Sequence, residues 1–235
     1  MRVEAVAWDQ AGNEGLASFP AKVLKRAFRK SSIEIEEDFV EQVAGPLARE
    51  IRLEDSTPAD TFRRVNEELR TLNEATVRES LAGSTQGKPL WQGAFKQLQG
   101  SEVTSRFAED RSYILNGVPV SRARHYGFDL ASVARAPITA TARGVVAFAG
   151  PLGIYGRCVI IDHGLGVASL YGHLSEIQVK KGEAVEAGQR LGRSGSTGLA
   201  GGDHLHFAIL VGDEYVNPLE WWDPKWLRSH IGVRL

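Results

Sequence analysis

Sulfur-containing residues are scarce in this sequence, which has one cysteine and one methionine among its 235 residues. A single cysteine excludes an intrachain disulfide framework and any metal cluster held by several thiolates. Cys158 lies in an apolar, strand-like stretch. We therefore expect it to be a core side chain and not a reactive thiol.

An excess of charge of either sign is also missing. Lysine and arginine together number 28 and aspartate and glutamate 29, which leaves a formal net charge of -1. Such a balance gives no broad basic field, so nucleic acid is not an expected partner. With 43% hydrophobic and 24% charged residues, the chain has the composition of a globular protein with one large or two smaller domains.

Long apolar runs are absent as well. The longest weakly polar stretch, residues 144–156, is interrupted by Pro151 and falls short of the roughly 20 residues that a membrane-spanning helix needs. Residues 1–8 alternate and carry charge, whereas an export signal has an unbroken apolar segment. We expect no transmembrane segment, and a chain that is either not exported or a fragment.

Residues 1–19 favour a fragment. Residues 1–8 alternate as in a β-strand, and residues 9–13 have turn chemistry. A lone strand is not stable and needs partners. The segment resembles the closing strand of a bacterial immunoglobulin-like repeat. We interpret residues 1–19 as a β-strand remnant, the end of an Ig-like domain, and the chain as a fragment of a longer exported protein.

Residues 20–105 are predicted to form a helical N-terminal region. Apolar residues have helical spacing in residues 20–30 and again in residues 37–50. Residues 57–60, a threonine followed by a proline and then an acid, form a good helix N-terminus. The helix that follows extends to about residue 81, and its apolar stripe consists of Phe62, Val65, Leu69 and Leu72.

The predicted helical region contains neither histidine nor cysteine, so its apolar stripe is interpreted as packing and not as a binding site. A basic cluster near its start is interpreted as a solvated helix face. The alternative, contact with an anionic polymer, stays open. The cluster consists of Lys22, Lys25, Arg26, Arg29 and Lys30.

Residues 106–235 are predicted to form a mostly antiparallel β domain. Asn116 and Gly117, between two apolar segments, indicate a tight hairpin. No strand–helix–strand crossover pattern follows, which argues against a parallel nucleotide-binding sheet. The expected fold class is therefore α+β. Further strands are predicted at residues 144–149, 158–162, 166–171 and 204–211.

Histidines and one aspartate in this β region have the spacing of metal ligands. His125 and Asp129 are four residues apart, and His204 and His206 are two apart. In an extended chain, an even separation places both side chains on one face. Imidazole and carboxylate donors suit zinc, and three protein ligands with an open fourth position characterise a catalytic site. His173 is a further candidate.

Several motifs of this region, in the same order, resemble the M23 or lysostaphin-type zinc metallopeptidases, also called LytM domains. The resemblance implies that His125, Asp129 and His206 bind one Zn²⁺ ion per chain. It also implies that His173 and His204 are uncoordinated catalytic histidines. The motifs are HYGFDLA at 125–131, PITA at 137–140, RGVV at 143–146, VIIDHG at 159–164, SLYGHL at 169–174, GQRLGRSG at 188–195 and GGDHLHF at 201–207.

The last of these motifs departs from the family pattern. Members often have a small residue and a proline before the H-x-H pair, whereas this chain has Gly202 and Asp203. Asp203 either orients a neighbouring histidine or is an exposed turn acid. Every implied ligand and catalytic histidine is present. The intact set favours an active enzyme over the degenerate members that act as binding or activating modules.

The activity that the resemblance implies is that of a zinc metalloendopeptidase acting on the peptides of bacterial peptidoglycan. A bond involving D-alanine is the first choice and a glycine bridge the second. No H-E-x-x-H helix supplies a glutamate base, so histidine has to fill that role. With peptidoglycan as the partner, the expected location is the cell envelope, periplasmic or extracellular. The sequence does not indicate an oligomeric state.

Two other functional interpretations stay open. The chain could be a non-enzymatic or occluded LytM-type module that binds the wall or activates another hydrolase. A lipoyl-like carrier domain would need a modified lysine on a tight hairpin, which Lys180 and Lys181 match poorly.

Residues near the candidate ligands also have structural interpretations. We expect His163 to be structural and the large aromatic residues to be packing, not substrate contacts. Residues 192–202 lack the order of a phosphate-binding loop and are interpreted as a connection that shapes a groove. The aromatic residues are Tyr171, Trp221 and Trp222.

Overall fold

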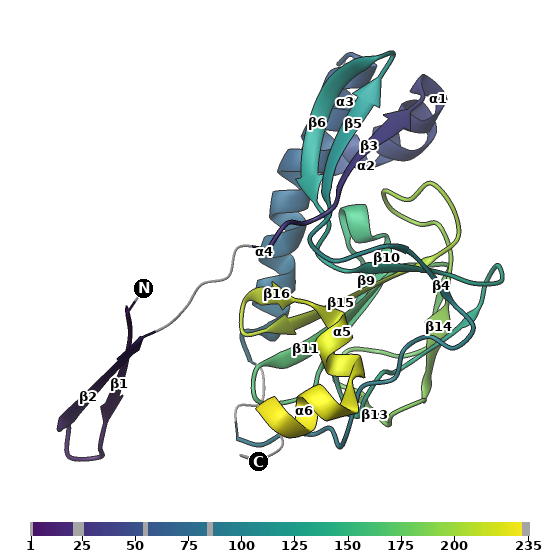
Figure 1. The fold of residues 1–235 in the computed structure, drawn as a ribbon. Coiled ribbons are helices and arrows are strands. Elements are labelled where there is room, and N and C mark those ends of the chain that lie inside the picture. The colour runs from purple at the N-terminus through teal and green to yellow at the C-terminus, as the bar shows by residue number, and fades with distance from the viewer. Residues whose placement is uncertain (1, 21–25, 54–55, 84–86, 232–235) are drawn as a thin grey trace.

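The computed structural model describes residues 2–20, 26–53, 56–83 and 87–231. Helices within residues 37–81 precede an antiparallel β-rich domain, which confirms the α+β prediction (Figure 1). Among the described helices, none combines the length and the apolar character that crossing a membrane requires.

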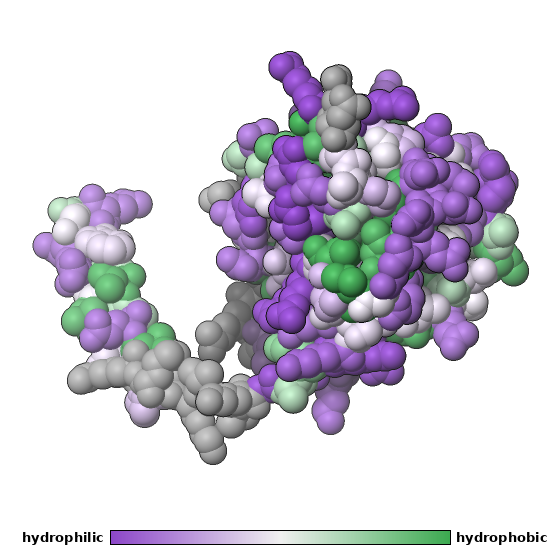
Figure 2. Space-filling model, turned by 90° about the horizontal axis from the view of Figure 1, so that it is seen from above, coloured by the Kyte–Doolittle hydropathy of each residue, from purple (hydrophilic) through white to green (hydrophobic). Residues whose placement is uncertain are grey.

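The chain begins with a two-stranded antiparallel hairpin, β1 (Arg2–Trp8) and β2 (Glu14–Pro20). Asp9 closes the turn, because its Oδ1 accepts hydrogen bonds from the backbone N–H groups of Ala11 at 2.8 Å and Asn13 at 2.9 Å. The predicted first strand is therefore present, and its partner is the segment that follows it. The hairpin lies apart from the body of the molecule in two perpendicular views (Figures 1 and 2). Its origin in an Ig-like domain stays a prediction.

The helix predicted for residues 20–30 is wrong wherever the structure describes that segment. Pro20 ends β2, residues 26–29 have no regular structure, and strand β3 (Lys30–Ile35) follows. Strand β3 pairs in parallel with β5 (Asp110–Leu115), and this long-range pairing keeps the chain extended from Lys30 onward. Of the basic cluster, Arg26, Arg29 and Lys30 are exposed, and Lys22 and Lys25 lie outside the described residues.

The helical run starts at Glu37 and its main helix has the predicted N-terminus, where Thr57 Oγ1 accepts a hydrogen bond from the Asp60 N–H at 3.3 Å. Phe62, Val65 and Leu69 are buried as predicted, but Leu72 is 55% exposed. Asn73 and Val77 continue the buried face in its place. The segments are α1 (Glu37–Phe39), η1 (Val40–Ala44), α2 (Gly45–Ala48), η2 (Arg49–Ile51), α3 (Pro58–Arg64), η3 (Val65–Leu69) and α4 (Arg70–Leu81).

A small sheet of order β3-β5-β6 packs on these helices. The predicted hairpin joins β5 to β6 (Val118–Arg124), and its turn residues Asn116 and Gly117 both have positive φ, 52° and 77°. The rings of Phe62 and Tyr113 lie 4.9 Å apart between the helices and the sheet. Strands β5 and β6 thus pair with the N-terminal region, although both follow residue 105. We refer to the helices and this sheet as the N-terminal module.

The large sheet has the order β13-β9-β10-β11-β15-β7-β4, with β16 paired to β15. Its strands include all those predicted after residue 140, and neighbours are antiparallel. The strands are β4 (Glu102–Ser105), β7 (Phe128–Ala131), β9 (Gly144–Pro151), β10 (Arg157–Asp162), β11 (Val167–Leu174), β13 (Ala184–Val185), β15 (Leu205–Val211) and β16 (Glu214–Val216). A second sheet comprises β12 (Glu176–Ile177), β14 (Arg190–Arg193) and β8 (Pro137–Thr139), and helices η4 (Gly153–Tyr155), α5 (Pro218–Trp222) and α6 (Pro224–His230) complete the domain.

Both faces of the large sheet are covered. In β10, Val159 and Ile161 belong to one core, whereas Cys158 and Ile160 belong to the core shared with the N-terminal module. Cys158 is fully buried, and burial raises the pKa of its thiol. It is a core side chain, as predicted. The N-terminal module therefore shares a hydrophobic core with the sheet that carries the candidate ligands.

Candidate metal centre

Two antiparallel strands bring the predicted ligands together. Asp129 in β7 lies directly opposite His206 in β15, and His125 precedes β7. Leu205 and Phe207 point into the core on one side of β15. The strand alternation places His206 on the opposite side, toward a cavity.

Three ligand atoms converge at this point. His125 Nε2 lies 3.0 Å from Asp129 Oδ1 and 3.1 Å from His206 Nδ1. His206 Nδ1 lies 3.0 Å from the same carboxylate oxygen. The three residues are the group that could hold a metal ion among the described residues.

The chemistry of these atoms fits a cation better than a hydrogen-bond network. His125 Nδ1 lies 3.0 Å from the Arg106 carbonyl oxygen and so carries the proton, which leaves a lone pair on Nε2. Asp129 Oδ1 is also an acceptor. A single hydrogen on His206 Nδ1 cannot be donated to both His125 Nε2 and Asp129 Oδ1, whereas an ion between the three atoms can accept a lone pair from each. Donors about 2.0 to 2.1 Å from a tetrahedral zinc ion lie about 3.3 Å apart.

Burial and nearby hydrogen bonds determine the protonation states of two of the candidate ligands, His206 and Asp129. Burial lowers the pKa of His206 to about 4. Burial opposes ionisation of Asp129, but hydrogen bonds from His125, His204 and His206 outweigh it, and the pKa of the carboxyl lies well below its usual range. A neutral imidazole and a carboxylate anion are the forms that bind metal. His206 Nε2 is buried without a hydrogen-bond partner in the described part of the chain.

His173 and His204 lie beside the triad with their rings 4.7 Å apart. Their Nδ1 atoms each lie 2.8 Å from a carbonyl oxygen, of Thr197 and of Gly202 respectively. Each Nδ1 therefore donates, which leaves Nε2 of the neutral ring as an acceptor. His173 also has a positive φ of 63°, which is uncommon for a residue with a side chain.

The two histidines differ in their preferred charge. Burial lowers the pKa of His173 to about 3. Burial also opposes protonation of His204, but the Asp129 carboxylate outweighs it and raises the pKa of His204. The His204 side chain is 18% exposed, and its Nε2 lies 3.6 Å from Asp129 Oδ1. His204 is thus the more accessible of the pair.

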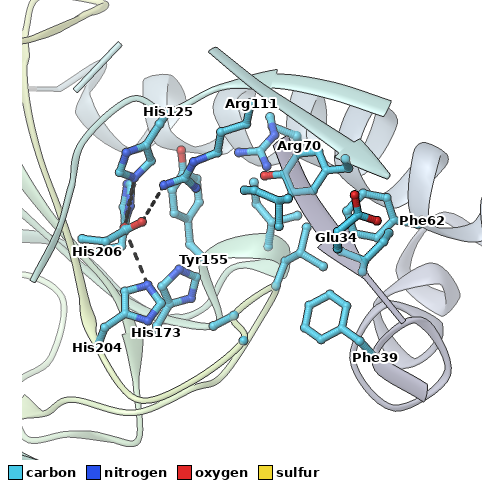
Figure 3. Close-up of a pocket in the computed structure, with 18 of the residues that line it drawn as sticks. Glu34, Phe39, Phe62, Arg70, Arg111, His125, Tyr155, His173, His204 and His206 are labelled. Carbon is cyan, nitrogen blue, oxygen red and sulfur yellow. Dashed lines mark hydrogen bonds and ion pairs between the residues drawn. The ribbon is translucent and has the colours of Figure 1, made fainter. Parts of the chain in front are cut away.

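A cavity of about 450 Å³ contains the triad and both histidines (Figure 3). Leu199, Ala200 and Gly201 line it, which agrees with the groove-shaping role expected for residues 192–202. Tyr155 also lines it, with its ring 5.6 Å from that of His206. Tyr155 lies outside the seven motifs, so no sequence pattern indicated it.

Arg111 is the second functional residue that sequence reasoning missed. Its Nη2 donates a hydrogen bond to Asp129 Oδ2 at 2.7 Å and another to Ser105 Oγ at 2.6 Å. Burial disfavours the charged guanidinium, but Asp129 outweighs it and raises the pKa of Arg111. The contact joins two different sheets, so no sequence spacing indicates it.

The remaining predicted residues have structural roles. Asp203 accepts hydrogen bonds from the Arg135 N–H at 2.9 Å and the Ser194 hydroxyl at 2.6 Å, so it ties two loops together and is bonded to no histidine. The Tyr171 hydroxyl accepts hydrogen bonds from the Ser169 hydroxyl at 3.0 Å and the Thr141 N–H at 2.8 Å, and His163 is fully buried. Trp221 and Trp222 pack in or against the main core.

Comparison with known proteins agrees with this geometry. Residues 123–218 match the model of Peptidase family M23. The DD-carboxypeptidase/endopeptidase Mpg of Neisseria meningitidis is 36% identical over 117 residues, which cover 50% of this chain and 27% of Mpg. The peptidoglycan DD-endopeptidase ShyA of Vibrio cholerae is 39% identical over 104 residues, which cover 43% of this chain and 24% of ShyA. The chain thus spans about a quarter of each relative.

A solved structure gives the same result for the fold. A Pseudomonas aeruginosa protein with a provisional M23 peptidase assignment superposes with a TM-score of 0.50 at 29% identity, covering 67% of this chain and 63% of that one. The family match falls on the segment that carries His125, Asp129 and His206. Residues 123–218, which include all three candidate ligands, therefore match peptidase family M23.

Proposed function

We propose that the protein is a zinc metalloendopeptidase that hydrolyses peptide bonds of bacterial peptidoglycan in the cell envelope. The observation that carries this proposal is the convergence of three ligand atoms within one cavity. Two relatives are named as DD-peptidases, and one of them as a peptidoglycan endopeptidase. Their names support a bond that involves D-alanine over a glycine bridge.

His125, Asp129 and His206 would hold one zinc ion per chain. When bound, such an ion lowers the pKa of a water molecule and polarises a carbonyl group. Asp129 Oδ2 is already engaged by Arg111, which leaves Oδ1 directed toward the two ligand histidines. The carboxylate is thereby oriented before metal arrives.

His173 and His204 would move the protons of the reaction. In the neutral ring, Nε2 of each can accept a proton from the attacking water. In the protonated ring, the same N–H can donate a hydrogen bond to the oxyanion of the tetrahedral intermediate. Both side chains line the cavity beside the triad, within reach of a bound peptide.

The cavity favours an active enzyme over an occluded module. The triad lies in a volume of about 450 Å³, and the His204 side chain is 18% exposed. This volume supports the approach of a peptide to the histidines with the N-terminal module in place.

The experiment that tests the function combines zinc analysis with mass spectrometry of fragments released from purified peptidoglycan. We expect one zinc ion per chain and fragments cut next to D-alanine. The His204→Ala variant should retain zinc and lose most activity, and His206→Ala should lose zinc. His230→Ala, which changes an exposed histidine of α6, is the matched control. Zinc-loaded protein that releases no fragments would refute the enzymatic proposal.

A further inference from the structure

The cavity extends from the metal centre onto the N-terminal module. Its far wall includes Phe39 and Phe62 from the helices and Tyr113 from β5. Arg70, at the start of α4, lies between Arg111 and Phe62 in Figure 3. A peptide that reaches the triad therefore also passes an apolar wall with one guanidinium group.

Arg70 is held in position from one side. Its Nε donates to the Asn66 carbonyl oxygen at 2.9 Å, and its Nη2 donates to Asn66 Oδ1 at 2.7 Å. Asn66 is 1% exposed, and its Nδ2 donates to Ser121 Oγ at 2.8 Å. The guanidinium is thus oriented by a buried amide, which is itself anchored to β6.

Arg70 nevertheless has no carboxylate at ion-pair distance among the described residues. In the part of the chain that the structure describes, it forms no ion pair, whereas Arg111 in the same cavity is paired with Asp129. Two acids of the cavity wall, Glu34 in β3 and Glu36 directly after it, are exposed and form no ion pair with Arg70 among the described residues. A half-buried guanidinium without an anion favours an anionic ligand.

The charge of Arg70 also acts on Tyr155, which lies close to the metal centre. Burial and the neighbouring Glu74 raise the pKa of the Tyr155 hydroxyl, and Arg70 opposes that rise. The Tyr155 ring in turn lies 5.6 Å from that of His206. Arg70 and the triad also line the same cavity.

We propose that Arg70 binds a free carboxylate of the substrate peptide, so that the N-terminal module selects the peptides that reach the metal centre. This inference rests on the proposed function. Arginine suits the role because its planar fork can donate two parallel hydrogen bonds to one carboxylate. The carboxylate is either the terminal one or one on a side chain of the peptide.

The test measures peptide binding to the full chain after chelation of metal, so that no hydrolysis interferes. The probe is a short D-alanine-containing peptide in four forms, in which the terminal carboxylate and a side-chain carboxylate are each free or amidated. We expect the peptide with one of its two carboxylates free to bind at least about tenfold more tightly than the form in which that carboxylate is amidated. The pair that shows the difference identifies which carboxylate is bound.

Variants on one helix decide whether Arg70 is responsible. Arg70→Gln should reduce the ratio of the two affinities to about one, and Arg70→Lys should restore part of it. Arg78→Gln, which changes an exposed arginine of α4, should leave the ratio unchanged. Because each ratio is measured within one variant, a general loss of folding does not mimic the effect.

Two outcomes would overturn the inference: a wild-type chain that does not distinguish acid from amide, and a ratio that survives in Arg70→Gln. Hydrolysis by the zinc-loaded chain is measured separately. Its absence would refute the proposed function, whereas the affinity ratio alone decides the role of Arg70.

Discussion

Arg111 and Asp129 form an ion pair of 2.7 Å between Nη2 and Oδ2 that joins the sheet of the N-terminal module to the candidate metal centre. The same guanidinium contacts Ser105 and Glu109, both of which are buried. A candidate metal ligand is thus oriented by a residue from a different sheet. The N-terminal module therefore contributes to the centre itself as well as to the cavity wall.

Replacing Arg111 with lysine separates geometry from charge. Lysine retains the positive charge but cannot bond Ser105 and Asp129 with one planar fork. We expect the affinity for zinc to fall about 10- to 100-fold, as is usual when an outer partner of a metal ligand is lost. Competition with a zinc chelator measures the affinity, and Arg122→Lys on the exposed part of β6 is the control. An unchanged affinity would show that charge alone orients Asp129.

Gly127, between His125 and Asp129, has no room for a side chain. An added Cβ would lie 2.4 Å from the Phe207 carbonyl oxygen and 2.9 Å from His206 Cε1. Gly127→Ala should therefore displace His206, with overpacking that costs about 1–3 kcal/mol of stability, and should abolish stoichiometric zinc binding. Metal analysis of the purified variant measures this. Gly202→Ala, where a Cβ would meet nothing within 4 Å, should bind zinc normally, and equal zinc content in both variants would contradict the prediction.

The centre was predictable because its signals are local. The even spacings within residues 125–129 and 204–206 require only extended backbone, and the strand pairing of Asp129 with His206 then places both pairs together. The hairpin at Asn116 and Gly117 was likewise encoded by its two turn residues.

The contributions of the N-terminal module were not predictable in this way. Strand β3 was not predicted, because its parallel partner β5 lies 80 residues later, with Lys30 opposite Asp110. Arg111 and Arg70 face the cavity only because of that pairing and of the packing of α4. Asp203 was adjacent in sequence to a histidine, yet its bonds go to Arg135 and Ser194. Sequence proximity did not determine these long-range contacts.

Asn73 of α4 connects the N-terminal module to the cavity wall. Its Oδ1 accepts a hydrogen bond from the Ile154 N–H at 2.9 Å, in the turn that carries Tyr155. Asn73→Ala leaves that buried N–H without its partner, which should lower the free energy of unfolding by about 1–3 kcal/mol. Urea denaturation measures the change, with Arg78→Ala on the exposed face as the control. Equal losses in the two variants would show that the contact does not stabilise the fold.

The burial of His163 predicts how the free energy of unfolding depends on pH. It is fully buried, with Nδ1 2.8 Å from the Arg143 carbonyl oxygen and Nε2 2.7 Å from Ser169 Oγ. Burial lowers its pKa from 6.5 to about 4. The unfolded chain therefore binds a proton on this residue at a higher pH than the folded chain does. Its stabilising contribution is complete above the unfolded pKa and is lost as the pH falls toward the folded pKa. Between about pH 7.5 and pH 5 the loss should be about 2 kcal/mol.

The His163→Gln variant has no imidazole at this position, so its free energy of unfolding should fall by about 2 kcal/mol less over that interval than that of the wild type. Urea denaturation at both pH values measures the difference, and His230→Gln should behave as the wild type because His230 is exposed. If His163→Gln lost as much stability as the wild type on acidification, the buried imidazole would not be the group that titrates.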